Sequence, residues 1–125
     1  MTKVLLSIKP EFANKIFDGT KKYEFRKILF KRPDISGVLV YASTPVQRII
    51  GEFTIDAIIS GTLPAVWEIA QNEAGISRDY FFSYFADKTK AHAIKIGKTR
   101  KFKRPRTLAQ YDIKNAPQSF VYVED

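Results

Sequence analysis

The sequence predicts an α+β fold built as a single domain around one hydrophobic core. Its 125 residues are enough for one core and too few for two. A hydrophobic content of 45%, with ten phenylalanines and six tyrosines, is ample for that core. Apolar residues alternate with period two in several segments, which is typical of strands, and recur at helical spacing in others. The chain therefore mixes strands with helices.

The N-terminal segments predict a strand followed by a helix. Residues 4–8 are expected to form a short strand that ends before Pro10. Pro10 suits the first position of the helix, and Gly19 suits the left-handed position just past its last turn. The apolar face of this helix is formed by residues at helical spacing, namely Phe12, Ala13, Ile16 and Phe17.

A second strand begins at Lys21, where the period of the pattern changes to two. Tyr23 and Phe25 should point to one side of this strand, and Glu24 and Arg26 to the other. Lys21 lies at the start of the strand, beside the turn. We therefore expect two cations and a carboxylate around one small patch.

Two more strands are predicted in the middle of the chain. Residues 38–42 form a nearly continuous apolar run, which indicates a strand buried on both faces. Residues 48–59 are the longest strand candidate, and Gly51 within it indicates a bulge or a close approach by another part of the chain. Strict alternation would place one set on a common face, namely Ile49, Gly51, Phe53, Ile55, Ala57 and Ile59.

Two helices are expected next, one between Gly61 and Gly75 and one that begins after the capping residue Ser77. The second carries an aromatic stripe at helical spacing, formed by Tyr80, Phe81, Tyr84 and Phe85. Such a stripe could stack on bases, but we assign it to the core. Because these helices carry most of the acidic residues in the middle of the chain, residues 36–87, we expect them to lie away from an anionic ligand.

The C-terminal part predicts two further strands and a basic segment. Residues 91–96 return to period two, with His92 on an apolar face, where we expect a packed core residue rather than a catalytic one. A last strand covers residues 120–123. Between them, six basic residues follow one another without an acid, namely Lys98, Arg100, Lys101, Lys103, Arg104 and Arg106. They suit phosphate binding, or alternatively the protection of a sheet edge against aggregation.

The spacing Gly19-x-Lys21-x-x-Glu24-x-Arg26 resembles the G-x-K-x-x-E-x-R signature of ASCH domains, a family of the PUA-like superfamily. Similar landmarks elsewhere are Ser7-Ile8-Lys9-Pro10, Tyr41-Ala42-Ser43-x-Pro45, Gly51-Glu52-Phe53 and Gln118-Ser119-Phe120-x-Tyr122. The resemblance spans residues 1–125 and implies a PUA-like β-barrel with flanking helices. It also implies a cleft that accepts RNA or a nucleobase derivative, and some members of the family are hydrolases.

The net charge of +8 is unevenly distributed along the chain. Residues 1–35 carry nine basic and four acidic residues (+5), and residues 88–125 carry ten and three (+7). Residues 36–87 carry two basic and six acidic residues (−4). If the two ends meet in space, they form one basic face, for which we expect an anionic partner.

These patterns define the candidate site. We expect a ligand or nucleic acid to be bound by Lys9, Lys21, Glu24, Arg26, Tyr41, Ser43, Arg100, Lys101, Lys103, Arg104, Gln118 and Ser119. The favoured function is an RNA-binding or modified-nucleotide-binding module, in RNA metabolism or transcription regulation. The alternative is a small hydrolase acting on RNA or on a nucleoside such as an N4-acylated cytidine, with Lys21 and Glu24 as catalytic residues. In the amidohydrolase branch of the family a threonine holds the position of Glu24, so that nucleophile is missing here.

Composition also limits cofactors and location. The chain has no cysteine and one histidine, which excludes thiolate metal sites and histidine clusters. We predict no cofactor and no resident metal, although a Mg²⁺ held by carboxylates and substrate phosphates stays open. No apolar run suits a signal peptide or a membrane span, so we expect an intracellular protein that does not engage membranes and is monomeric.

Overall fold

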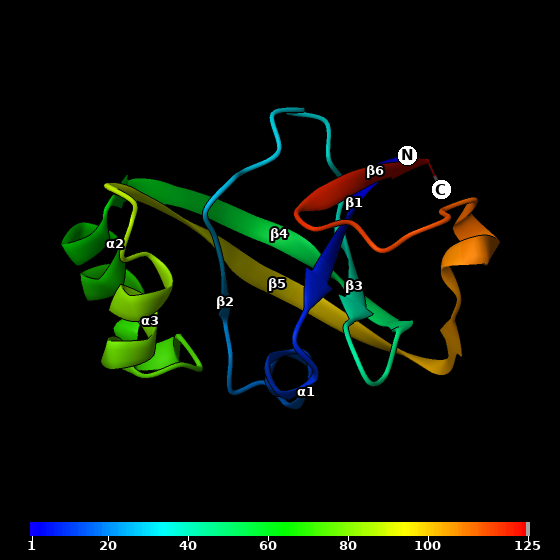
Figure 1. The fold of residues 1–125 in the computed structure, drawn as a ribbon, viewed down its shortest axis with the longest axis horizontal. Coiled ribbons are helices and arrows are strands. Elements are labelled where there is room, and N and C mark those ends of the chain that lie inside the picture. The colour runs from blue at the N-terminus through cyan, green and yellow to red at the C-terminus, as the bar shows by residue number, and fades with distance from the viewer. Residues whose placement is uncertain (125) are drawn as a thin grey trace.

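Six strands form one strongly curved sheet in the order β2-β5-β4-β3-β1-β6 in the computed structural model, which describes residues 1–124 (Figure 1). The strands are β1 (Thr2–Ile8), β2 (Tyr23–Arg26), β3 (Val38–Ala42), β4 (Arg48–Thr62), β5 (Lys90–Arg106) and β6 (Phe120–Glu124). β1 and β3 are parallel, and all other neighbours are antiparallel. The predicted α+β class is therefore confirmed.

Three α-helices lie outside the sheet, and two 3₁₀ turns accompany them. The helices are α1 (Pro10–Asp18), α2 (Leu63–Ala70) and α3 (Arg78–Tyr84), and the turns are η1 (Gln71–Glu73) and η2 (Leu108–Tyr111). α1 begins at Pro10 and is followed by Gly19 with a φ of 88°, as the sequence predicted. None of the helices in residues 1–124 is long and apolar enough to cross a bilayer.

The sheet is open, so the predicted closed barrel is not formed. β2 and β6 are its two edges and do not pair with each other. β2 has only four residues, and after Arg26 the chain leaves the sheet in a long connection to β3. The Arg26 guanidinium spans the gap instead, donating to the carbonyl of Ser7 in β1 and to that of Ser119 just before β6. The Arg26 side chain therefore links the two edges of the sheet, which in a closed barrel would be joined by hydrogen bonds between strands.

The apolar side chains form three clusters. The concave side of the sheet and α1 enclose the first, which includes Val4, Leu6, Ile16, Val40, Phe53 and Ile94. α2 and α3 cover the second, which includes Tyr23, Phe25, Val66, Phe81, Phe85 and Ala93. The third lies against η2 and includes Leu5, Leu39, Tyr41, Ile49 and Phe102. Tyr23 and Phe25 thus pack in the second cluster, as the period-two pattern predicted, although Phe25 also reaches the pocket that Glu24 and Arg26 line.

Bulges in β4 overturn the strict alternation that we expected there. The pairing of β4 with β5 shifts register between Ile49 and Gly51, and that of β3 with β4 shifts at Val40 and Tyr41. Ile49 therefore packs in the cluster against η2, whereas Phe53 packs in the concave cluster. Because a bulge inserts extra residues on one strand, side chains on either side of it exchange faces.

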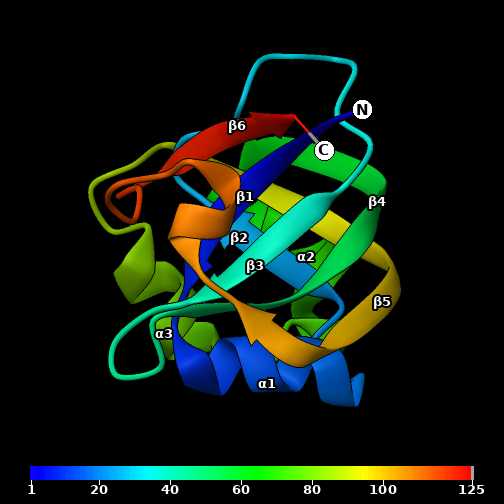
Figure 2. The same cartoon turned by 90° about the vertical axis from the view of Figure 1, so that its right-hand side faces the viewer.

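At Gly51, helix α1 packs tightly against the sheet. A Cβ at this position would lie 2.5 Å from the ring of Phe17 and 2.6 Å from the carbonyl oxygen of Arg100. No side chain fits there, which is the close approach that the glycine suggested. It fixes α1 across the end of the curved sheet, where Figure 2 shows the helix beneath β5.

Candidate functional site

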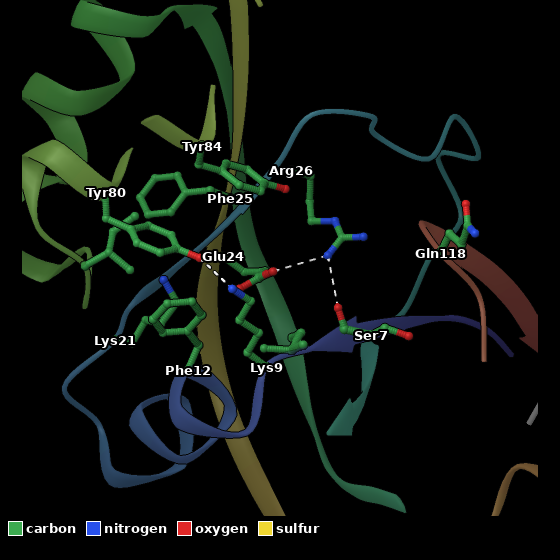
Figure 3. Close-up of a pocket in the computed structure, with 12 residues that line it drawn as sticks. Ser7, Lys9, Phe12, Lys21, Glu24, Phe25, Arg26, Tyr80, Tyr84 and Gln118 are labelled. Carbon is green, nitrogen blue, oxygen red and sulfur yellow. Dashed lines mark hydrogen bonds and ion pairs between the residues drawn. The ribbon is translucent and has the colours of Figure 1, made fainter. Parts of the chain in front are cut away.

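A pocket of about 200 Å³ opens where the sheet fails to close. Its walls come from the end of β1, from α1, β2 and α3, and from the segment before β6 (Figure 3). The three signature residues Lys21, Glu24 and Arg26 all line it. Sites for drug-sized ligands usually measure about 300–1,000 Å³, so this pocket suits a group of the size of a single base.

Lys21 is held in the pocket by a turn and by the loop before α3. Its backbone N–H donates to the carbonyl of Lys15, 3.0 Å away, which completes the end of α1. Its side chain is only 2% exposed, and Nζ donates to the carbonyl of Ala74 at 2.8 Å. A side chain on Gly75 would lie 2.6 Å from the Lys21 Cβ and Cγ, so this loop closes directly over the lysine.

The surroundings of Lys21 make its amine unusually easy to deprotonate. Nζ lies 4.8 Å from the ring centre of Phe25 and 5.4 Å from that of Phe12. Burial lowers the pKa of the amine from 10.5 to about 8, the Glu24 carboxylate opposes this shift, and Lys15 adds to it. The amine can therefore lose a proton near neutral pH more readily than an ordinary lysine.

Glu24 and Arg26 share one face of β2, but they are held very differently. The Arg26 guanidinium is fixed by the carbonyls of Ser119, at 2.6 Å, and Ser7, at 3.4 Å. Glu24 accepts one contact from Arg26 Nη1 at 3.4 Å, which is long for a charge-assisted hydrogen bond. Its second oxygen has no hydrogen-bond partner among residues 1–124. Glu24 is 6% exposed. Among residues 1–124 it is the one carboxylate that lines the pocket.

Aromatic side chains form the wall opposite the signature strand. Tyr80 meets Phe12 edge to face, with ring centres 5.3 Å apart, and its hydroxyl lies 3.3 Å from Lys9 Nζ. Tyr84 stands one turn further along α3, and burial raises the pKa of its hydroxyl, which therefore stays protonated. Figure 3 shows Lys9, Lys21 and Glu24 directed toward one another beside this wall.

The aromatic stripe of α3 was therefore only half correctly assigned. Phe81 and Phe85 are fully buried, as predicted, but Tyr80 and Tyr84 line the pocket. The hydroxyl groups were the available signal, because a tyrosine needs a polar partner or solvent at one end. α3 was also expected to lie away from the ligand site because its region is acidic, and instead it forms a wall of the pocket.

Some of the other predicted site residues reach the pocket and some do not. Lys9 and Gln118 line the pocket. Ser119 does not line it, but its carbonyl accepts a hydrogen bond from Arg26, which does. Tyr41 is buried in the cluster against η2, and Ser43 lies half-buried in the turn after β3. Neither lines the pocket. His92, expected in the core, is half-buried, and its Nδ1 lies 2.7 Å from the Ser60 hydroxyl.

The basic residues at the end of β5 form a separate surface on the other side of α1. Those named as ligand contacts, Arg100, Lys101, Lys103 and Arg104, are all exposed and do not line the pocket. These four residues therefore lie apart from the pocket, although Lys3 from the N-terminal segment and Arg100 from the C-terminal segment both pair with Glu52. No group of three or more His, Asp or Glu side chains suited to a metal ion occurs in residues 1–124.

The chain is a small α+β domain with an open, curved sheet and a cationic, aromatic-walled pocket at the gap of that sheet. The ASCH domain model matches residues 6–100, which is more than half of the sequence. The chain belongs to the ASCH domain family.

Similar proteins of known name support this assignment. The chain is 34% identical over 92 residues to an ASCH domain-containing ribonuclease of Zymomonas mobilis, covering 73% of the chain and 62% of that protein. It is 28% identical over 124 residues to the large ribosomal subunit protein uL22 of Ureaplasma parvum, covering 97% of the chain and 39% of that protein. The chain thus spans less than two thirds of either relative. The crystal structure of ASCH from Zymomonas mobilis matches with a TM-score of 0.88 and 30% identity over 98% of this chain and 88% of that one.

Proposed function

We propose that the pocket binds one nucleotide-like group of an RNA. The observation that carries this proposal is the carboxylate of Glu24, one oxygen of which has no hydrogen-bond partner among residues 1–124, in a pocket lined mainly by cations, aromatic rings and polar groups. A base presents both donors and acceptors on its edge, and its faces stack on aromatic side chains. The ribonuclease named among the relatives supports RNA as the class of ligand.

The pocket offers each part of a nucleotide a chemically suited partner. Tyr80 and Tyr84 present aromatic surface to a base. Glu24 accepts from an exocyclic amino group, and the exposed amine of Lys9 donates to a phosphate at the rim. Arg26 is occupied by main-chain carbonyls and mainly positions Glu24. A PUA-like ancestry for the open sheet, and an intracellular, monomeric protein, remain part of this proposal.

A second candidate is hydrolysis of RNA or of an acylated nucleoside at the same site. The observation that favours it is the lowered pKa of Lys21 beside Glu24. With a carboxylate as general base and an amine that gives up its proton near neutral pH, the pocket holds the two groups that activation of water requires. The threonine of the amidohydrolase branch is replaced by Glu24, so the nucleophile would be water rather than a hydroxyl side chain.

Replacing Glu24 by glutamine distinguishes the two candidates. Glu24→Gln keeps the shape of the side chain and removes its charge. If Glu24 is a recognition group, we expect RNA binding to weaken by about 1–3 kcal/mol, because a charged acceptor is lost from a buried site. Binding is measured by fluorescence anisotropy with a short single-stranded RNA. Product formation from short RNAs and N4-acylated cytidines is measured in parallel.

The control is Glu11→Gln, which removes one negative charge from the exposed face of α1. This variant should bind like the wild type. If Glu24→Gln loses product formation but binds normally, the hydrolase assignment replaces the binding module. Equal binding by both variants, without any product from the wild type, would show that the pocket is not the RNA site.

A further inference from the structure

The last nine residues of β5, Lys98–Arg106, are a basic segment that the pocket does not use. β2 pairs only with residues 92–95 of β5, so the edge of this segment on the β2 side has no neighbouring strand among residues 1–124. Five of its residues are cationic and exposed, namely Lys98, Arg100, Lys101, Lys103 and Arg104. Glu52 in β4 pairs with Arg100, with Nη1 and Oε2 3.2 Å apart. Lys101, Lys103 and Arg104 have no ion-pair partner within residues 1–124.

A bulge pushes the centre of this segment out of the sheet. Gly51 pairs with Lys101, and Ile49 pairs with Arg106, so five steps along β5 match two along β4. The extra residues cannot all take part in the ladder, and they form a hollow of about 510 Å³ lined by cationic side chains and Phe102. Bulges of this kind redirect side chains and end pairing, and they often stand beside functional sites.

The floor of the hollow is ordered by stacking. Phe102 is 7% exposed, and the Arg106 guanidinium lies 3.8 Å from its ring centre. Arg106 Nη1 also donates to the Tyr111 hydroxyl at 2.6 Å. Protection of a sheet edge accounts for exposed lysines and for a bulge, but it does not account for an arginine stacked on a buried phenylalanine.

Helix α1 connects the hollow to the pocket. Phe12 lines the pocket, and Phe17 flanks Gly51 together with the carbonyl of Arg100. Phe12 and Phe17 are five positions apart in α1, which corresponds to a rise of about 7.5 Å along the helix axis. A single extended chain can contact both sites, whereas a free nucleotide cannot.

We infer that the end of β5 binds the phosphates of a single nucleic-acid strand, one nucleotide of which occupies the pocket. The inference rests on the proposed function and specifies its ligand as a strand rather than a free nucleotide or nucleoside. Cations on an exposed strand supply sequence-independent affinity and set the position of the ligand. The hollow contributes no base recognition, so RNA and DNA strands should be held equally well by β5.

The test is a charge-matched pair of triple variants. Lys101→Gln, Lys103→Gln and Arg104→Gln together remove three exposed cations and leave the pair of Glu52 and Arg100 intact. Lys31→Gln, Lys88→Gln and Lys90→Gln together remove three exposed cations elsewhere. Binding of a single-stranded RNA of about ten nucleotides is measured between about 50 and 200 mM salt, the range over which phosphate contacts change affinity strongly. Binding of a mononucleotide is measured beside it, and circular dichroism confirms that both variants fold.

We expect the β5 variant to lose about 2 in the slope of log affinity against log salt, since each phosphate contact on a single strand contributes about 0.7. If the wild type and the β5 variant bind RNA equally at 1 M salt, the variant should therefore bind roughly 100-fold more weakly than the wild type at 0.1 M. Mononucleotide binding should not change. An unchanged slope, or the same loss in the control variant, overturns the inference. Polyglutamate or anionic vesicles that bind the wild type as tightly as RNA, and lose as much in the β5 variant, also overturn it.

This outcome is separable from that of the proposed function. If Glu24→Gln leaves RNA binding unchanged while the β5 variant reduces the salt slope, the strand-binding surface stands and the pocket assignment fails. If Glu24→Gln weakens binding while the β5 variant behaves like its control, the pocket stands and the strand-binding surface fails.

Discussion

Phe53→Ala should lower the free energy of unfolding by about 3–5 kcal/mol, the range found when a buried aromatic ring is removed and leaves a cavity. Phe53 is 2% exposed and lies in the concave cluster, paired with Val38 of β3 just beyond the bulge of β4. The other members of this cluster are held by the close packing of the sheet and α1, so they can fill the gap only in part. Equilibrium denaturation by urea measures the effect.

Phe25→Ala provides the companion measurement in the second cluster. Phe25 is 5% exposed, packs edge to face against Phe81 at 5.2 Å, and carries Lys21 over its ring. We expect a loss of about 3–5 kcal/mol here as well. Ile69→Ala, on an exposed side chain of α2, is the control and should stay within about 0.5 kcal/mol of the wild type. Losses below about 1 kcal/mol at both phenylalanines would contradict the burial described above.

The signature strand was predictable from sequence because its pattern is local. Alternation over four residues is enough to place Tyr23 and Phe25 in the apolar cluster under α2 and α3, and Glu24 and Arg26 outside it. The ends of α1 were predictable for the same reason, since Pro10 and Gly19 act on their immediate neighbours. Where one or two residues decide the conformation, the sequence is sufficient.

The failed expectations all depend on contacts between distant segments. Whether the sheet closes depends on how β2 meets β6, almost a hundred residues later in the chain, and Arg26 occupies that gap. Tyr41 follows the alternation of β3 together with Leu39, but distant segments decide that this face packs against η2 and not against the pocket. Period-two reasoning has no information about register, and a single bulge reverses every face beyond it.

Lys21 combines both situations. The turn at Gly19 places the lysine at the mouth of the strand, which the sequence indicated, but its burial is due to Ala74 and Gly75, more than fifty residues further on. A charged amine in an almost fully enclosed site is costly unless it is paired, and here its partners are a carbonyl, two aromatic rings and the Glu24 carboxylate. This cost predicts a pH dependence.

The stability of the wild-type protein should rise as the pH increases from about 8 to about 10.5, and Lys21→Met should lose this rise. In that range the folded chain has released the Lys21 proton, whose pKa is lowered to about 8, while the unfolded chain still holds it at its ordinary value of 10.5. The unfolded state therefore binds more protons, and the free energy of unfolding increases with pH. A shift of this size corresponds to something on the order of 3 kcal/mol over the whole window.

Lys21→Met preserves most of the side-chain volume and removes the titrating group, so its unfolding free energy should show no contribution from this position between pH 8 and pH 10.5. Lys22→Met is the matched control, because Lys22 is the exposed neighbour and its removal should leave the rise intact. Urea denaturation of the three proteins at several pH values measures the difference. Near pH 7 we expect Lys21→Met to be at least as stable as the wild type while binding RNA more weakly, because the buried charge costs stability and belongs to the proposed ligand site. An equal rise of the unfolding free energy with pH in the wild type and in Lys21→Met would mean that the Lys21 amine titrates normally. The hydrolase candidate, which depends on the lowered pKa of this amine, would then lose its support.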